Sequence, residues 1–149
     1  MATQIIVKTA LSTILECTCG DDVSPGMLVI PTATVETPVT RGNLGVKVAL
    51  ADTVDVNNVW VVSLNVLGDT GGKFIDLPTY TAGNDLRVQA CYSGDIIYVQ
   101  SSTNVIALGS PVSIDIANPG CVKTWSSGDA ILGYALEDAA DGFVKIACA

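Results

Sequence analysis

Residues 130–149 read AILGYALEDAADGFVKIACA. Apolar residues dominate both ends of this stretch, and Asp141-Gly142 lies between them. An Asp-Gly pair favours the tight turn that joins two antiparallel strands, because both residues readily adopt the left-handed backbone that such a turn requires. The stretch therefore predicts a strand over Ala130 to Leu136, a hairpin turn at Asp141-Gly142, and a returning strand over Phe143 to Cys148.

The same pattern continues upstream, where short apolar segments alternate with clusters of Gly, Asn, Asp, Ser and Pro. Val, Ile and Thr supply 45 of the 149 residues, and these residue types favour pleated sheet over helix. We therefore predict an all-β fold with little helix, either an antiparallel β-barrel or a two-sheet sandwich. The other predicted strands are Ile5 to Thr9, Leu11 to Cys17, Met27 to Ile30, Val46 to Leu50, Val59 to Val66, Phe74 to Leu77, Leu86 to Tyr92, Ile96 to Gln100, Val105 to Leu108, Val112 to Ile116 and Cys121 to Trp125.

A weak internal repeat suggests how the chain is organised. Residues 49–55 and 135–141 share the pattern Ala-Leu-x-Asp-x-x-Asp, and each is followed within a few residues by an apolar segment. This pattern is typical of a strand, an Asp-stabilised turn and a returning strand. No linker or change of composition separates the two halves, so we predict a single β domain over residues 1–149 with two weakly related hairpin units.

Charge and composition argue against several classes of function. The formal net charge is −8 and the chain contains no histidine. A nucleic-acid surface needs clustered Lys and Arg, and catalytic triads and most zinc sites need an imidazole, so we expect no nucleic-acid partner and no enzyme, metal or cofactor site of these kinds. The mean hydropathy is +0.49, yet no run of about 18 apolar residues occurs, so no membrane span is expected.

The sequence also bears on where the protein works. No basic start followed by an apolar segment and a cleavage site is visible, so synthesis and assembly in a cytoplasm are expected. Only 15% of the residues are charged. Monomers usually carry more surface charge than this, which predicts that part of the surface is buried against other subunits.

Three motifs have both a functional and a structural interpretation. The stretch Gly68 to Lys73 lacks the spacing of a phosphate-binding loop, and its Asp69-Thr70-Gly71 matches the tripeptide of aspartic proteases. The pairs Asp52 with Asp55 and Asp138 with Asp141 could ligate calcium. A glycine-rich loop in the first case, and turn capping by Asp side chains in the others, are the favoured interpretations.

Cysteines and tryptophans are expected to pack rather than react. The five cysteines include Cys17 and Cys19, which face the same way on a strand, and no histidine is present to activate a thiol. We predict that Cys17 and Cys19 are small buried hydrophobes. Trp60 and Trp125 lie within predicted strands, and core or interface packing is favoured over a sugar-binding platform.

The order of several segments resembles a known family. These segments are 23–29 around Ser24-Pro25-Gly26, 44–52, 93–99 around Gly94-Asp95, and 131–146. Their order and spacing are similar to those of the small capsid cement or decoration proteins of tailed bacteriophages. The resemblance implies a non-enzymatic homotrimer on the outer surface of the virion capsid, where each subunit bridges neighbouring major capsid proteins.

Residues Ile5, Ile6 and Val7 are the predicted capsid or subunit contact. They form an apolar run with no charge before Lys8, and on a strand they would point to both faces, so one core could not bury all three. We predict that this arm is covered by a neighbouring copy or by the major capsid protein; otherwise the loop Asn65 to Asn84 is the next candidate. Two alternatives stay open: a β-rich ligand- or sugar-binding module elsewhere on the particle, and an aspartic-protease-like dimer that uses Asp69.

Overall fold

The computed structural model describes residues 6–8, 14–35, 45–51, 59–63 and 79–149, and these residues contain strands and turns but no helix. The predicted all-β fold class is confirmed. The strands are β1 Ile6–Lys8, β2 Ile14–Cys19, β3 Leu28–Val35, β4 Val46–Leu50, β5 Trp60–Val62, β6 Asp85–Ala90, β7 Ile96–Gln100, β8 Pro111–Ile114, β9 Val122–Thr124, β10 Gly133–Ala135 and β11 Phe143–Cys148.

Five strands from the first part of the chain close into a barrel in the order β2-β4-β3-β5-β6, with β6 pairing back to β2. All pairs are antiparallel except β2 with β4, which is parallel. Closure gives each strand a hydrogen-bonded neighbour on both sides. Side chains that fill the barrel core are Cys17, Cys19, Val23, Val29, Val48, Val62, Leu86 and Val88.

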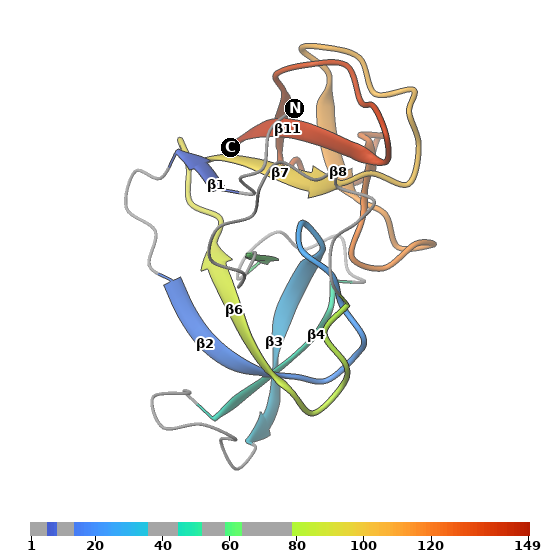
Figure 1. The fold of residues 1–149 in the computed structure, drawn as a ribbon. Coiled ribbons are helices and arrows are strands. Elements are labelled where there is room, and N and C mark those ends of the chain that lie inside the picture. The colour runs from blue at the N-terminus through green and yellow to red at the C-terminus, as the bar shows by residue number, and fades with distance from the viewer. Residues whose placement is uncertain (1–5, 9–13, 36–44, 52–58, 64–78) are drawn as a thin grey trace.

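A six-stranded antiparallel sheet has the order β1-β7-β11-β10-β8-β9 and lies beside one end of the barrel (Figure 1). Its two edges are β1 and β9. Five of its strands follow the barrel in sequence, whereas β1 precedes the barrel and returns to pair with β7. The sheet therefore combines one strand that precedes the barrel in the sequence with five strands that follow it.

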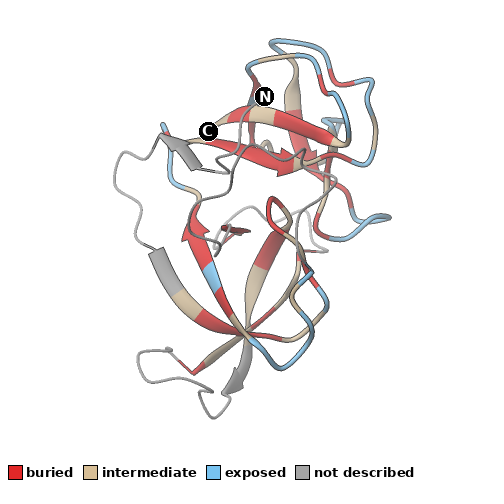
Figure 2. Ribbon diagram, viewed as in Figure 1, coloured by how far each residue is buried: buried red, intermediate tan, exposed pale blue. Residues whose placement is uncertain are grey.

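The barrel and the sheet share a core. Leu28 and Val61 from the barrel strands pack in the same buried cluster as Ile97 and Val144 from the sheet. Backbone hydrogen bonds also cross the junction, from Leu28 N to Gly120 O at 2.8 Å and from Gln100 N to Gly26 O at 2.8 Å. Figure 2 shows buried residues in the strands of both regions.

Two turns show the backbone that the sequence predicts. Asp141 and Gly142 have φ values of 54° and 78°, and Ala140 and Phe143 on either side exchange two backbone hydrogen bonds of 2.9 and 3.0 Å. This is the predicted tight hairpin turn. At Ser24-Pro25-Gly26, Gly26 has φ 87° and Met27 N donates to Ser24 O at 3.1 Å, as expected for a Pro-Gly turn.

The predicted strands at 46–50, 96–100 and 143–148 match β4, β7 and β11. The predicted strand Val105 to Leu108 is wrong, because this segment is irregular and ends in a turn. Ser110 N donates to Ala107 O at 3.0 Å, Gly109 has φ 84°, and Ile106 is the buried residue of the segment. The predicted strand Phe74 to Leu77 lies outside the described residues.

The internal repeat does not produce two equivalent hairpins. β10 and β11 pair with each other, as the repeat predicts. β4 and β5 do not pair, because β3 lies between them in the barrel. The hairpin interpretation of residues 49–55 is therefore wrong, and similar sequences serve different topologies in the two halves.

Candidate interaction surface

Large apolar side chains are exposed in one half of the described structure. The exposed ones are Tyr92, Val105, Leu108, Ile116, Trp125, Tyr134 and Leu136. All seven belong to the six-stranded sheet, its connections, or the turn that leads from the barrel into it. Contiguous exposed apolar groups mark surfaces that bind partners, and the sheet brings several of these residues together.

Tyr134, Pro111 and Trp125 lie side by side across three strands. Tyr134 in β10 is the register partner of Pro111 in β8. The backbone N of Trp125, which follows β9, donates to Pro111 O at 2.9 Å, so Trp125 continues the register on the other side of Pro111. Cross-strand neighbours share a face of the sheet, and here Tyr134 is 46% exposed and Trp125 36% exposed.

The same row continues in the opposite direction. Tyr134 is also the register partner of Ala147 in β11, and Ala147 is the partner of Ile96 in β7. Both residues are half-buried. We name Ile96, Ala147, Tyr134, Pro111 and Trp125 the apolar row; it crosses the sheet from β7 to the end of β9 without a charged residue.

Leu136 and Leu108 extend the apolar row on one side. Leu136 N donates to Lys145 O at 2.8 Å, so the β10 ladder continues by one residue and places Leu136 on the face of Tyr134. The neighbouring loop is held by two hydrogen bonds of 2.8 Å, from Gly109 N to Ala135 O and from Leu108 N to the Asp138 carboxylate. The exposed Leu108 is therefore kept beside β10.

Charged side chains lie next to the apolar row. Lys145, on the face of Ala147, pairs with Glu137 at 3.6 Å and lies 5.5 Å from the centre of the Tyr98 ring. Interaction with Tyr98 and Glu137 raises the pKa of Lys145. An apolar centre with charged groups at its margin is the usual composition of a protein-binding surface.

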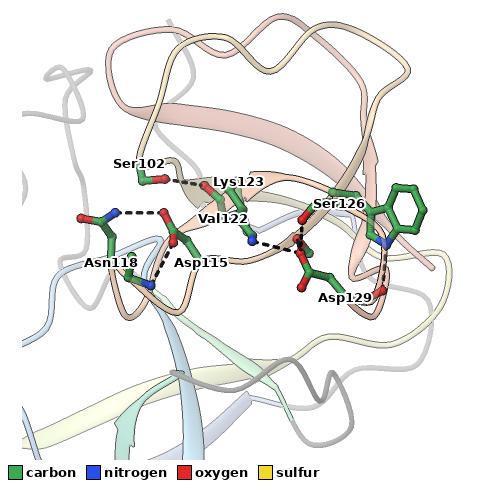
Figure 3. Close-up of polar contacts among 10 residues, drawn as sticks. Ser102, Asp115, Asn118, Val122, Lys123, Ser126 and Asp129 are labelled. Carbon is green, nitrogen blue, oxygen red and sulfur yellow. Dashed lines mark hydrogen bonds and ion pairs between the residues drawn. The ribbon is translucent and has the colours of Figure 1, made fainter.

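A polar network holds Trp125 in place (Figure 3). The indole Nε1 donates to Asp129 O at 2.7 Å. The Asp129 carboxylate accepts hydrogen bonds from Ser126 Oγ at 2.8 Å and Ser113 Oγ at 3.1 Å, and Lys123 Nζ lies 3.0 Å away. Hydrogen bonds from Lys123 and Ser126 lower the pKa of Asp129. A side chain that is already fixed loses less conformational entropy when a partner binds.

A second carboxylate supports the junction with the barrel. Asp115 accepts hydrogen bonds from Ala117 N at 3.0 Å and Asn118 Nδ2 at 2.9 Å, which fixes the turn that leads to Gly120 (Figure 3). Gly120 O then accepts the hydrogen bond from Leu28 N. Burial raises the pKa of Asp115, but hydrogen bonds to the carboxylate outweigh that effect, and the net pKa is lowered.

The described part of the predicted contact, Ile6 and Val7, lies at one edge of the sheet. Ile6 and Val7 belong to β1, whose Ile6 is the register partner of Ile97 in β7. Ile5 lies outside the described residues. β1 is thus an edge strand that pairs on one side with its own chain, and coverage of its other side stays a prediction.

Asp138 of the second Asp pair accepts a hydrogen bond from Leu108 N at 2.8 Å, so it stabilises a turn thirty residues away in the sequence. Asp141 occupies the left-handed position of the hairpin turn. Asp52, Asp55 and Asp69, together with the rest of the Gly68 to Lys73 motif, lie outside the described residues. Within the described ranges, no cluster of three or more His, Cys, Asp or Glu side chains could hold a metal ion.

The cysteines are free thiols, and Cys17 and Cys19 are fully buried in the barrel, as predicted. Burial raises the pKa of each of these two thiols to about 11. Trp60 packs against the barrel core. In the part of the chain that the structure describes, no helix has the length and apolarity to cross a membrane.

Sequence reasoning missed the apolar row. Its members are separated along the chain by intervals that no local pattern connects, and they meet only through the order β7-β11-β10-β8-β9. One local signal for the apolar row is Tyr134 in Gly133-Tyr134-Ala135. Side chains alternate between the two faces of a strand, and this aromatic residue takes the position that should face solvent.

Comparison with known proteins supports the fold but gives no family. No protein-family model matches the sequence, and no curated protein matches it either. The crystal structure of the head fiber gp8.5 N base in bacteriophage phi29 is similar, with a TM-score of 0.55 and 12% sequence identity, over 93% of this chain and 95% of that chain. The chain therefore shares its fold, along nearly its whole length, with a protein of a bacteriophage head.

Proposed function

We propose that this chain is a non-enzymatic structural protein of a tailed-bacteriophage virion, which decorates the outer capsid surface and stabilises it by bridging major capsid proteins. The observation that carries the proposal is the fold shared with the head fiber base over 93% of this chain. The resemblance of the ordered sequence segments to capsid cement and decoration proteins supports the same class of particle.

The apolar row supplies a surface suited to this role. Tyr134 and Trp125 are exposed aromatic side chains, and aromatic residues contribute much of the binding energy in protein interfaces. A decoration protein needs many moderate contacts rather than one strong one, because repeated attachment around a symmetry axis multiplies weak affinities. We assign the apolar row to the contact with the major capsid protein.

Binding to undecorated capsids tests this assignment. The double variant Tyr134→Ser/Trp125→Ser removes both exposed rings, and we expect it to need at least about ten times more protein to saturate the capsids. Arg87→Ala changes an exposed residue on the barrel and should bind like the unmodified protein. Equal saturation by the double variant and the Arg87→Ala control would contradict the assignment.

Removal of the arm tests the second predicted contact. Deletion of Ala2 to Val7 should leave the barrel folded because, among the described strands, β1 pairs with β7 of the sheet and with no barrel strand. Capsid binding should weaken if the arm is an anchor. Unchanged saturation would exclude the arm and make the Asn65 to Asn84 loop the next candidate.

Self-association is part of the proposal, with a homotrimer as the expected form. Sedimentation equilibrium of the full chain should give about three times the monomer mass of 15.4 kDa. A monomer at all concentrations tested would contradict the trimer. The saturation experiment would still test capsid binding by the monomer.

Localisation on the particle decides between the proposed role and its alternatives. Electron microscopy of virions labelled on this chain should place the label on the outer surface of the head. A label on the tail would overturn the capsid role and favour a ligand- or sugar-binding module. Pepstatin-sensitive cleavage by the pure protein, lost in Asp69→Asn, would instead establish the aspartic-protease alternative.

A further inference from the structure

Cys91 and Cys148 meet where the barrel passes into the sheet. Cys91 directly follows β6, and its backbone N donates to Val59 O in the barrel region at 3.2 Å. Cys148 is the last residue of β11. The turn after Cys91 is joined to Cys148 by two backbone hydrogen bonds, from Cys148 N to Asp95 O at 2.8 Å and from Gly94 N to Cys148 O at 3.1 Å.

The two residues also belong to one buried region. Cys91 packs against the buried cluster that contains Cys148, and the Cys148 thiol is close enough to raise the pKa of Cys91. Cys91 is the less buried of the two residues. Cys17 and Cys19 differ in this respect because they lie fully buried inside the closed barrel.

We propose that Cys91 and Cys148 form a disulfide bond when the protein enters an oxidising medium, and that this bond joins the barrel covalently to the last strand of the sheet. A small-molecule disulfide such as oxidised glutathione is the oxidant. The Cys91 thiolate attacks this disulfide and displaces one glutathione thiolate; the Cys148 thiolate then attacks the Cys91 sulfur of the mixed disulfide and displaces the second. The two protein thiols lose two electrons and two protons, and the oxidant becomes two thiols.

The reaction is slow at neutral pH. The neighbouring Cys148 thiol and burial hold the pKa of Cys91 well above its usual range, which keeps the thiolate fraction small. The thiols therefore persist in a reducing cytoplasm. They become cross-linked during long exposure outside it.

The position of the bond determines what it stabilises. β7, β8, β9, β10 and β11 all lie between Cys91 and Cys148 in the sequence. The bond would close these five strands into one covalent loop anchored at the barrel, which restricts the unfolded chain more than a short loop would. The benefit to a released virion rests on the proposed function, whereas the bond itself depends only on the two thiols.

The test uses the purified full-length chain, with no capsid present. It is incubated with oxidised glutathione at about pH 9, where thiolates are more abundant, and a parallel sample is kept reduced. We expect the five free thiols to fall to three, a mass loss of about 2 Da, and a cross-linked peptide that contains Cys91 and Cys148. Tm should rise by roughly 10 °C and return to its original value on reduction.

Matched variants identify the pair. Cys91→Ser and Cys148→Ser should each abolish both the cross-link and the rise in Tm. Cys121→Ser removes another partly buried thiol and should leave both intact. The proposal is overturned if all five thiols persist, if peptide mapping finds a different pair or only glutathione adducts, or if the cross-link forms with no rise in Tm. Because no capsid enters the assay, these outcomes are independent of the proposed function.

Discussion

The barrel and the six-stranded sheet both bury a core of aliphatic side chains, but they differ in what they leave at the surface. Within the described residues, the seven exposed large apolar side chains all belong to the sheet, its connections or the turn that leads into it. The barrel strands pair on both sides, whereas the sheet ends in two edges. Under the proposed function, the closed barrel is the scaffold and the open sheet carries the contacts.

Carboxylates follow the same division. In the barrel, Asp21 and Asp22 accept backbone hydrogen bonds from Leu50 N at 3.0 Å and Ala82 N at 2.9 Å. In the sheet, the Asp138 carboxylate holds the loop of Leu108, and the Asp129 carboxylate accepts hydrogen bonds from Ser126 and Ser113 beside the backbone carbonyl that binds the Trp125 indole. Asp21 and Asp22 therefore complete the backbone pairing of the barrel, while Asp129 and Asp138 help to position exposed apolar groups of the sheet.

The largest expected effect tests whether the two regions unfold together. Leu86→Ala in the barrel core and Ile146→Ala in the sheet core should each lower the free energy of unfolding by about 2–5 kcal/mol, because each leaves a cavity. The shared core predicts one transition in denaturant, monitored by circular dichroism, that both variants shift. Leu108→Ala, at a residue 65% exposed, should change stability by less than about 0.5 kcal/mol. Two separate transitions, each moved by one variant, would show that the regions are independent.

Packing across the junction is tested by a pair of glycine variants. Gly26 and Gly128 both have positive φ, at 87° and 99°. An alanine Cβ at Gly26 would lie 2.6 Å from the Phe143 ring, whereas at Gly128 nothing lies within 4 Å. Gly128→Ala should therefore cost about 1–2 kcal/mol for the backbone alone, and Gly26→Ala about 1–3 kcal/mol more. Equal losses in urea titrations would mean that the ring moves aside freely and the junction is loosely packed.

A smaller effect concerns pH and the turn at the junction. The pKa of Asp115 is lowered in the folded state, so its ionised form stabilises folding above the ordinary value of 3.8, and this contribution is lost as the pH falls below it. Denaturant midpoints of the unmodified protein should therefore drop as the pH falls below about 4. Asp115→Asn cannot be protonated in this way, and its midpoint should depend less on pH. An identical pH dependence in both proteins would assign the acid sensitivity to other carboxylates.

The smallest effect is expected on the exposed face of the sheet. Trp125→Phe keeps an aromatic ring but removes the hydrogen bond from Nε1 to Asp129 O. The loss should be no more than about 1 kcal/mol of unfolding free energy, because water can satisfy the exposed carbonyl. Thermal unfolding of the two proteins measures it. A loss above about 2 kcal/mol would show that Trp125 supports the fold itself rather than the surface alone.

Local sequence patterns predicted much of the fold. Short apolar segments located β4, β7 and β11, and the Asp-Gly pair located the last hairpin turn, because these features depend on neighbouring residues alone. The strand predicted over Val105 to Leu108 is wrong for the same reason. Four consecutive apolar residues favour a strand, but the turn at Gly109 and the hydrogen bond from Leu108 N to Asp138 determine the conformation of this segment. Cross-strand register is a long-range property, so the neighbours Tyr134, Pro111 and Trp125 could not be connected from the sequence.

The position of β1 has a consequence for how the chain folds. Its partner β7 lies about ninety residues further along, and the whole barrel sequence stands between them. A ribosome-bound chain must therefore emerge beyond β7 before β1 can find its place. Such long sequence separation slows folding, because the intervening chain must be ordered before the contact forms. The apolar β1 therefore has no native partner while the barrel sequence is being synthesised. Early closure of the barrel would limit the apolar surface that the nascent protein exposes during this time, and so reduce its aggregation.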